Sequence, residues 1–184
     1  MGIVDDIRRY IPFNEQEERD KCLMLSLLQG DQDLFTRDNE WTHFTASAWI
    51  TSPDRQLVLM CYHNLYDSWS WLGGHADGER DLASVALREV REESGLAHAR
   101  LVSPDIYSLE VLTVDGHIKA GRYVSSHLHL NLTYLIEADP EETLFTKPDE
   151  NSGLRWFTPE GAVAASSEPW FRERIYPKLN AKLK

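Results

Sequence analysis

A short helix set between strand-like segments is the feature that most constrains the fold of this chain. Asp81 is a typical N-cap residue, and Gly95 followed by apolar Leu96 is a typical helix end, so the spacing predicts a helix over 82–94. Its apolar side chains recur at helical spacing and form one stripe: Leu82, Val85, Ala86 and Val90. A helix with one apolar stripe must cover a sheet or another helix.

The segments on both sides of this helix have the composition of β-strands. We predict strands at residues 44–51, 56–62, 109–114, 127–136 and 154–157. The first two are joined by a hairpin-like turn at 52–55, and the fourth alternates, with His127, His129, Asn131 and Thr133 on one face. Thr158 and Pro159 begin another predicted helix, and a last helix is predicted over about 169–183. The order of elements predicts an α/β fold with a mixed sheet between helical layers.

The first part of the chain, residues 1–40, is predicted to be a helical extension, and residues 41–184 are predicted to form the main domain. Asn14 followed by Glu17 is a capping-box pattern for a helix start. A narrow apolar stripe follows at Leu23, Leu27 and Leu28, before the end expected at Gly30. The extension should pack on the main domain or against a second subunit, which makes a homodimer possible.

The charge of the chain bears on its partners. Its 184 residues contain 30 Asp and Glu against 19 Lys and Arg, a formal net charge of −11. This excess is opposite to that of proteins that bind nucleic-acid backbones, so we expect no nucleic-acid duplex as partner. No apolar run is long enough to span a membrane, and the charged N-terminus does not resemble a secretory signal. The expectation is a cytoplasmic protein without a membrane partner.

Three carboxylates share one side of the predicted helix. Glu89, Glu92 and Glu93 stand at i, i+3 and i+4, where like charges repel and the helix dipole disfavours anions. A solvated acidic face is one interpretation. The alternative is a site for Mg²⁺ or Mn²⁺, which favour carboxylate oxygens. The preceding Gly73 and Gly74 favour the metal site, because glycines allow a backbone carbonyl to approach the same ion.

The stretch from Gly74 to Leu96 resembles the Nudix box of the Nudix hydrolase family. That box is a glycine followed at fixed spacing by Arg-Glu-apolar-x-Glu-Glu-x-Gly-apolar, and every position from Arg88 to Leu96 matches. One position departs, because Arg80 stands where the family has a glutamate that supports the box arginine. Arg88 must therefore find another partner, for which Asp77, Glu79 and Glu93 are the candidates.

The resemblance implies a Nudix-type α/β/α sandwich and the hydrolysis of a nucleoside diphosphate linked to another group. It implies that Glu89, Glu92 and Glu93, with the Gly73 carbonyl, hold one to three divalent cations, Mg²⁺ or Mn²⁺, across a small-molecule diphosphate. Arg88 would support this catalytic set. A base is also needed, and Glu89, Glu93 or a glutamate from a later loop could serve. Glu150 is the loop candidate, although an ordinary loop carboxylate is an equal alternative.

Two further groups of side chains are candidates for substrate binding. Trp69 and Trp71 precede the glycines and could stack on a nucleobase; Trp69 is the better candidate, because Trp71 adjoins the glycine turn and is expected in the core. His127 and His129 share a strand face, where they could polarise a phosphate or hydrogen-bond a base. Half-buried polar positions are the commoner explanation, and metal ligation the least expected.

Two other functions are compatible with the same fold. Isopentenyl-diphosphate isomerases use a cysteine, but the sequence around Cys61 lacks their cysteine-containing motif. A non-catalytic ligand-sensing domain is the third possibility, although such domains usually have a degenerate box, whereas the glutamates here are intact. The pyrophosphohydrolase remains the leading hypothesis, with the group linked to the diphosphate undetermined.

Overall fold

The computed structural model describes residues 2–119 and 121–183. Its helices are α1 (Ile3–Arg9), α2 (Glu15–Leu27), α3 (Leu82–Ser94), α4 (Pro159–Ala165), the π-helix η1 (Phe171–Ile175) and α5 (Tyr176–Ala181). Its strands are β1 (Thr42–Thr51), β2 (Val58–His63), β3 (Ser68–Ser70), β4 (Leu72–His75), β5 (Arg100–Leu101), β6 (Ser108–Val114), β7 (His117–Lys119), β8 (Arg122–Val124), β9 (His127–Glu137) and β10 (Asn151–Phe157).

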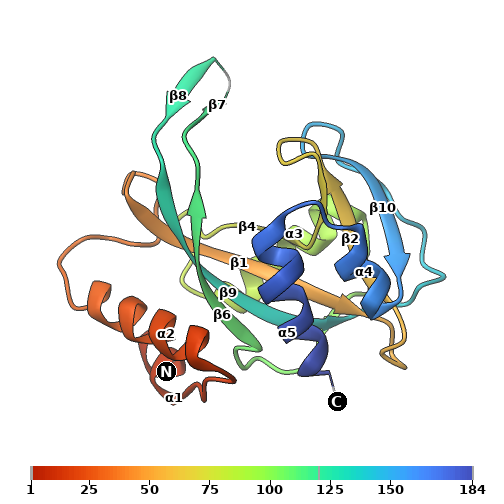
Figure 1. Ribbon diagram of the computed structural model, residues 1–184, viewed down its shortest axis with the longest axis horizontal. Helices are drawn as coiled ribbons and strands as arrows, with labels where there is room; N and C mark the ends of the chain where they lie inside the picture. Colours follow the sequence, from red (N-terminus) through yellow and green to blue (C-terminus); the bar gives the residue numbers. More distant parts are fainter. Residues whose placement is uncertain (1, 120, 184) are drawn as a thin grey trace.

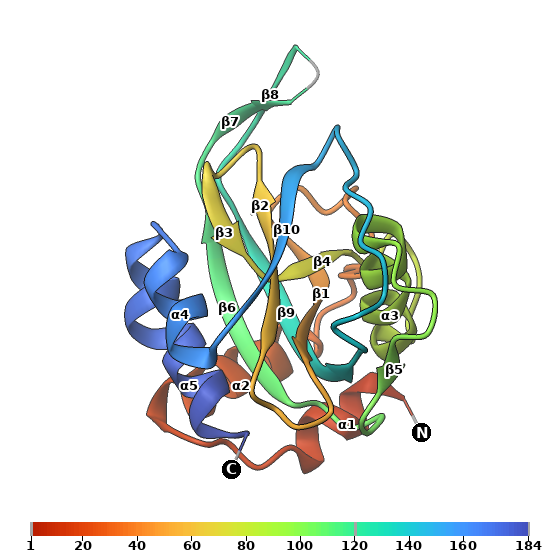
Figure 2. The same cartoon turned by 90° about the vertical axis from the view of Figure 1, so that its right-hand side faces the viewer.

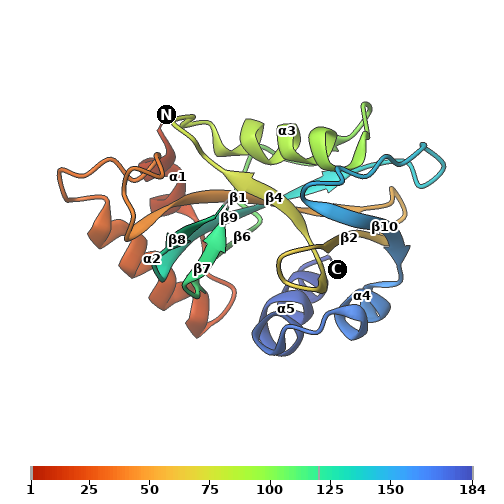
Figure 3. The ribbon, with the colours of Figure 1, turned by 90° about the horizontal axis from the view of Figure 1, so that it is seen from above.

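The elements form three layers around a curled sheet. Figure 3 shows α3 on one face of the sheet and the C-terminal helices α4 and α5, with the N-terminal α2, on the other. Figure 1 shows the ribbon of β7 and β8 rising beyond the sandwich as an arm. The side view in Figure 2 shows the sheet between α3 and the pair α4 and α5. The predicted α/β/α sandwich is therefore confirmed.

The sheet is mixed, as predicted. Its main path runs β10-β2-β1-β9-β5, and β3, β4 and β6 pair with β2, β1 and β9 respectively. The central β1 and β9 are parallel, with His43 beside His129 and Ser47 beside Thr133, and the other pairs are antiparallel. Because side chains alternate along each strand, these polar residues of β1 and β9 share one face of the sheet.

The predicted central helix is observed over its whole length. The Asp81 side chain accepts a hydrogen bond from the Ser84 amide at 3.2 Å, and Gly95 has the left-handed φ of 75° that a helix end of this kind requires. The predicted turn at 52–55 joins β1 to β2, and the apolar face predicted for β9 packs in the core through Leu130, Leu132 and Tyr134. The short β3 and β4 were not predicted, because glycines and serines have low strand propensity.

The N-terminal helix α2 begins as predicted but buries a different face. Asn14 accepts the Glu17 amide at 3.0 Å. The expected stripe is wrong at Leu23, which is 41% exposed, whereas Met24 and the charged Glu17 are fully buried. Polar partners from other elements satisfy Glu17, including Lys178 of α5 at 3.1 Å. The charge pairing, rather than the leucines, orients this helix on the main domain.

The C-terminal helix is less regular than predicted. The segment expected to be one helix over about 169–183 is the π-helix η1 followed by α5. Pro177 stands in the first turn of α5 and has no N–H to donate, and a widened turn precedes it. No helix in the described part of the chain is both long and apolar enough to cross a bilayer. The possible homodimer stays a prediction.

Candidate functional site

A cavity of about 1090 Å³ opens beside β4 and α3. Strand β4, helix α3, the 147–150 loop and the arm contribute to its walls. Its polar lining includes Thr45, Ser47, His75, Glu89, Glu92, Glu93, His129, Asn131, Lys147 and Glu150. Its apolar and aromatic lining includes Leu65, Tyr66, Trp71, Leu112, Ile118 and Phe171. The cavity therefore combines a charged end with an aromatic wall.

The two glycines of β4 allow α3 and the sheet to approach closely. A Cβ atom on Gly73 would stand 2.5 Å from the Ala46 carbonyl oxygen of β1. A Cβ on Gly74 would stand 2.5 Å from the carboxyl carbon of Glu89. Both spacings are shorter than real contacts, so the first glycine permits strand pairing and the second makes room for the Glu89 carboxylate.

The structure brings the predicted glutamates to one side of the cavity at three depths. Glu93 is deepest, at 5% exposed, and one of its carboxyl oxygens accepts the Gly73 amide at 3.3 Å. The Glu89 side chain is 13% exposed, and the Glu92 side chain is 49% exposed. The i, i+3, i+4 spacing on α3 therefore places one carboxylate against β4, one beside it and one at the rim.

Burial raises the pKa of the two inner carboxyl groups, those of Glu89 and Glu93. Burial raises the pKa of Glu93 to about 9, and the negative charges of Glu150 and Glu89 add to the effect. The pKa of Glu89 is also raised, mainly by burial, against a lowering contribution from its hydrogen bond with Arg88. Carboxyl groups buried this way are stable as anions only beside additional positive charge.

Two cations accompany the carboxylates. Arg88 donates to Glu89 at 2.9 Å and stands 3.8 Å from Glu92. Lys147 stands 3.9 Å from Glu92 and 3.0 Å from Glu150. When all four glutamates are ionised, they exceed the two cations by two negative charges, which one divalent cation would balance.

The partners of the box arginine differ from the prediction. Arg88 pairs with Glu89 and Glu92 and not with Asp77, Glu79 or Glu93. The two alternatives in the loop are already engaged. The Asp77 carboxylate holds Arg37 in a two-pronged pair at 2.7 and 2.8 Å, and Glu79 accepts the amides of Arg80 and Asp81.

Arg80 itself points away from the carboxylates. Its guanidinium lies over the Phe35 ring at 4.5 Å and 3.5 Å from Asp33. Arg80 therefore connects the loop before α3 to the segment before β1, and Arg88 pairs with glutamates of α3 instead.

The donor set at the charged end fits a hard divalent cation. Glu89, Glu92 and Glu93 offer carboxylate oxygens, and the glycine next to them can offer a backbone carbonyl. Mg²⁺ and Mn²⁺ take oxygen ligands of this kind together with water and phosphate. The space that Gly74 leaves for Glu89 is an additional sign that this carboxylate is positioned rather than merely solvated.

The predicted histidines both stand on β9, and His129 is the one that reaches the cavity. His129 lines the cavity, and its Nε2 stands 3.1 Å from the Nε2 of His127. Burial lowers the pKa of His129 to about 2, with the neighbouring imidazoles contributing. His43 and His75, which the sequence did not single out, complete a group of four rings.

Trp69, like His127, is a predicted site residue that is not part of the cavity lining. Its ring packs edge-on against Tyr62 at 5.4 Å and Phe157 at 5.0 Å. Trp71 is largely buried, as expected, and yet it forms part of the cavity wall. The aromatic side chain of this wall that is most open to solvent is Tyr66, which is 43% exposed. Strand alternation separates Trp69 from the cavity face.

Sequence analysis missed two other lining residues. Lys147 precedes Glu150 by three positions, and this opposite-charge spacing was a usable signal for it. Glu168 has one buried carboxyl oxygen without a hydrogen-bond partner among the described residues, and burial raises its pKa to about 7. No local pattern around Glu168 distinguishes it from a surface glutamate.

The two glycines give a matched pair of expected results. Gly73→Ala should lower the free energy of unfolding by about 1–3 kcal/mol, because the added methyl group meets the β1 backbone. Gly74→Ala should cost less stability but weaken Mn²⁺ binding, because only the flexible Glu89 side chain must move. Urea denaturation and Mn²⁺ titration measure the two effects. Equal metal affinities for Gly74→Ala and wild type would contradict the placement of Glu89.

The Glu93 carboxyl should make the metal-free protein less stable as pH rises. Its pKa is about 9 in the folded state against an ordinary value of 4.5, so the folded state retains a proton that the unfolded state releases. This contribution is complete below pH 4.5 and is lost as pH rises towards 9. Thermal unfolding without metal should show the loss in wild type and not in Glu93→Gln. Parallel pH profiles for the two proteins would contradict the assignment.

Comparison with known proteins identifies the fold. The sequence profile described as NUDIX domain matches residues 41–179. A C. elegans Ap4A hydrolase in a binary complex is 17% identical, with 76% of this chain and 96% of that chain covered and a TM-score of 0.56. A NUDIX-family hydrolase from Clostridium perfringens is 21% identical, with 77% and 95% covered and a TM-score of 0.55.

A third solved structure is similar over the same part of the chain. The E. coli dihydroneopterin triphosphate pyrophosphohydrolase is 16% identical, with 73% of this chain and 92% of that chain covered and a TM-score of 0.54. At these identities the structural likeness shows a shared fold. No curated protein sequence matches the chain significantly.

Proposed function

The chain belongs to the NUDIX domain family, and on that premise we propose that it is a divalent-metal-dependent pyrophosphohydrolase. Its substrate would be a nucleoside diphosphate linked to another group, cleaved at the diphosphate bond. The names of two structural neighbours, an Ap4A hydrolase and a dihydroneopterin triphosphate pyrophosphohydrolase, belong to the same class of reaction. They support the reaction class and leave the linked group open.

One observation carries this proposal. Two carboxylates, Glu89 and Glu93, are held in low-dielectric surroundings beside a cavity, where Arg88 donates a hydrogen bond to the first and the Gly73 amide donates one to the second. An ordinary acidic surface has no cause to bury such groups, because each uncompensated charge costs several kcal/mol. A divalent cation and its phosphate ligand would offset that cost. The buried pair therefore favours a metal site over a solvated acidic face.

The positions of the residues indicate the role of each in the proposed reaction. Glu89, Glu92 and Glu93 would hold Mg²⁺ or Mn²⁺, which neutralises charge on phosphoryl oxygens and lowers the pKa of a water molecule. Arg88 fixes the orientation of Glu89 through its hydrogen bond.

Glu150 is the base that we propose, because its carboxylate lies on the cavity wall and is more exposed than that of Glu93. Lys147 holds it at 3.0 Å, which fixes its position without burying it. A base in contact with solvent can return its proton after each turnover.

The aromatic wall of the cavity suits a nucleobase. Tyr66, Trp71 and Phe171 provide aromatic surface, and each base stacked on such a surface gains about 1–3 kcal/mol. The unpartnered oxygen of Glu168 lies among these residues and could accept an N–H from a base. Tyr66 replaces Trp69 as the proposed stacking residue.

The alternative functions have less support. An isomerase of the isopentenyl-diphosphate type needs a reactive cysteine, but Cys61 is 1% exposed, and burial raises the pKa of its thiol. A non-catalytic sensing domain would not require the charged end of the cavity, where four glutamates converge.

A substrate panel tests the proposal. The full chain would be incubated with Mg²⁺ or Mn²⁺ and ADP-ribose, dinucleoside polyphosphates, oxidised nucleotides, nucleotide sugars and isopentenyl diphosphate. Release of a nucleoside monophosphate or phosphate from one class, stopped by a chelator, supports a pyrophosphohydrolase. An isomerised product, or saturable binding without turnover of any compound, would contradict it.

A further inference from the structure

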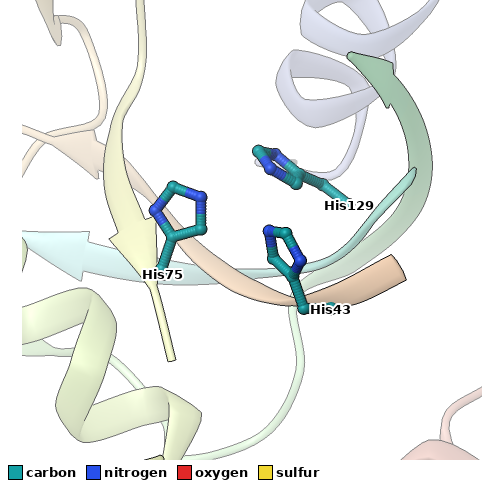
Figure 4. A group of neighbouring side chains, drawn as sticks. All are labelled: His43, His75 and His129. Atoms are coloured by element: carbon teal, nitrogen blue, oxygen red, sulfur yellow. The ribbon is translucent and has the colours of Figure 1, made fainter. Parts of the chain in front are cut away.

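A group of four imidazole rings lies on strands β1, β4 and β9, and two of the rings, His75 and His129, line the cavity. His43 comes from β1, His75 from β4, and His127 and His129 from β9. The ring centres of His43, His75 and His129 lie 5.0–5.2 Å from one another. Figure 4 shows these three side chains converging from three strands.

We propose that His43, His75 and His129 form a second metal site, which binds Zn²⁺ and is distinct from the glutamate site. Each of the three offers one ring nitrogen, and these candidate ligand atoms all lie within 4.8 Å of one another. Around one Zn²⁺ with bonds of about 2.0–2.1 Å, tetrahedral ligand atoms stand about 3.3 Å apart. Small rotations of the side chains would bring the three nitrogens to that spacing.

The hydrogen bonds of His43 direct one of its nitrogens to the group. Its Nδ1 stands 3.0 Å from the Asn39 carbonyl oxygen, which can only accept, so Nδ1 carries the proton. Its Nε2 therefore has the lone pair, and this atom is buried without a hydrogen-bond partner among the described residues. His43 is only 4% exposed, so an unpartnered acceptor here costs free energy that a metal ion would recover.

His127 fixes the tautomer of His129 in the same way. The Nδ1 of His127 stands 2.8 Å from the Ser125 carbonyl oxygen, so it donates and leaves the lone pair on Nε2. In the 3.1 Å hydrogen bond between the two Nε2 atoms, His129 Nε2–H is then the donor and His127 Nε2 the acceptor. This leaves the His129 Nδ1 lone pair available, with His127 as a positioning residue that holds the ring. Histidine ligands of metals generally donate their other N–H to a hydrogen-bond acceptor, and the His127 Nε2 would fill that role here.

The chemistry of the group selects the metal. Neutral imidazole nitrogens suit Zn²⁺ and similar borderline ions, whereas Mg²⁺ prefers oxygen. Three protein ligands leave a coordination position open to the cavity that His75 and His129 line, where a water or phosphate oxygen could bind.

Zinc binding can be measured independently of any activity. The full chain, freed of metals with a chelator, would be titrated with Zn²⁺ and with Co²⁺ in excess Mg²⁺, which occupies the carboxylate site. We expect one tightly bound Zn²⁺ per chain and a visible Co²⁺ absorption typical of nitrogen ligands. His75→Ala and His129→Ala should each lower Zn²⁺ affinity at least a hundredfold, and His127→Ala about 10–100-fold.

Two controls separate this site from the glutamates and from general effects. His98→Ala, at an exposed histidine paired with Glu142, and Glu93→Gln should retain the bound Zn²⁺. Circular dichroism would establish that each variant is folded. The proposal is overturned if the wild type binds no Zn²⁺, if His75→Ala and His129→Ala bind it like the wild type, or if Glu93→Gln loses it. Failure of the hydrolase assay would leave this result unaffected.

Discussion

Glu93→Gln is expected to reduce kcat at saturating metal and substrate by about a hundredfold or more, because it removes the most buried of the three carboxylates. Charge stabilisation at a metal site contributes several kcal/mol to a transition state, and each 1.4 kcal/mol is about a factor of ten in rate. Glutamine has the same shape and can still accept the Gly73 amide, so the fold should be retained. Steady-state kinetics in Mg²⁺ measure the loss.

A glutamate outside the cavity provides the matched control for this variant. Glu160 stands in the first turn of α4 and is exposed, so Glu160→Gln should change kcat less than twofold. The two variants differ from wild type by the same chemical change. Equal rates for both would exclude Glu93 from the catalytic set.

Lys178→Met is expected to lower the free energy of unfolding by about 3–5 kcal/mol, because it leaves buried carboxylates without their cation. Lys178 of α5 is 4% exposed and contacts Glu110 at 2.8 Å and Glu17 at 3.1 Å, both of them fully buried. Burial alone would raise the pKa of Glu17, but Lys178 and several hydrogen bonds hold it below its ordinary value. Urea denaturation measures the change through the midpoint at constant slope.

An exposed ion pair is the control for the buried one. Arg8 and Asp5 form a pair at 3.4 Å on the surface of α1, and Arg8→Ala should cost less than about 0.5 kcal/mol. A second substitution, Glu110→Gln, should recover part of the loss in Lys178→Met, because it removes one of the unpaired charges. A loss below about 1 kcal/mol in Lys178→Met would mean that the buried network does not hold α2 and α5 together.

The same network connects the N-terminal helices to the cavity. The other carboxyl oxygen of Glu110 accepts hydrogen bonds from Asn131 and Thr133 at 3.0 Å each. Asn131 in turn accepts from Thr45 and from Ser47 of the cavity lining. The extension is thus joined through polar contacts to the sheet face that holds the site, and its division from the main domain at residue 41 stays a prediction.

Capping residues and side-chain alternation were sufficient to predict the position of some helices and strands. Asp81 and Gly95 defined α3 at both ends, and the alternation from His127 onwards defined β9. The shared helix side of Glu89, Glu92 and Glu93 followed from their spacing, and the adjoining glycines and the resemblance to the Nudix box favoured a metal site there. These features depend on residues within a few positions of one another, which is the range over which periodicity and capping act.

Contacts between distant segments could not be predicted in this way. Gly73 is needed in β4 because the β1 backbone lies too close to leave room for a Cβ atom. Strand propensity cannot predict this contact, since glycine is generally unfavourable in strands. His43 and His75 meet His129 only through the register of three strands. Glu17 is buried because Lys178, more than 160 positions later, compensates its charge.

Hydrolysis in isotopically labelled water tests the central claim most directly. If the α3 glutamates hold the metal for attack of water on a diphosphate, one labelled oxygen should enter one phosphate-containing product per turnover. Incorporation should require Mg²⁺ or Mn²⁺ and should fall with the rate in Glu93→Gln. Turnover without incorporation, or incorporation that persists at the wild-type rate in Glu93→Gln, would contradict it.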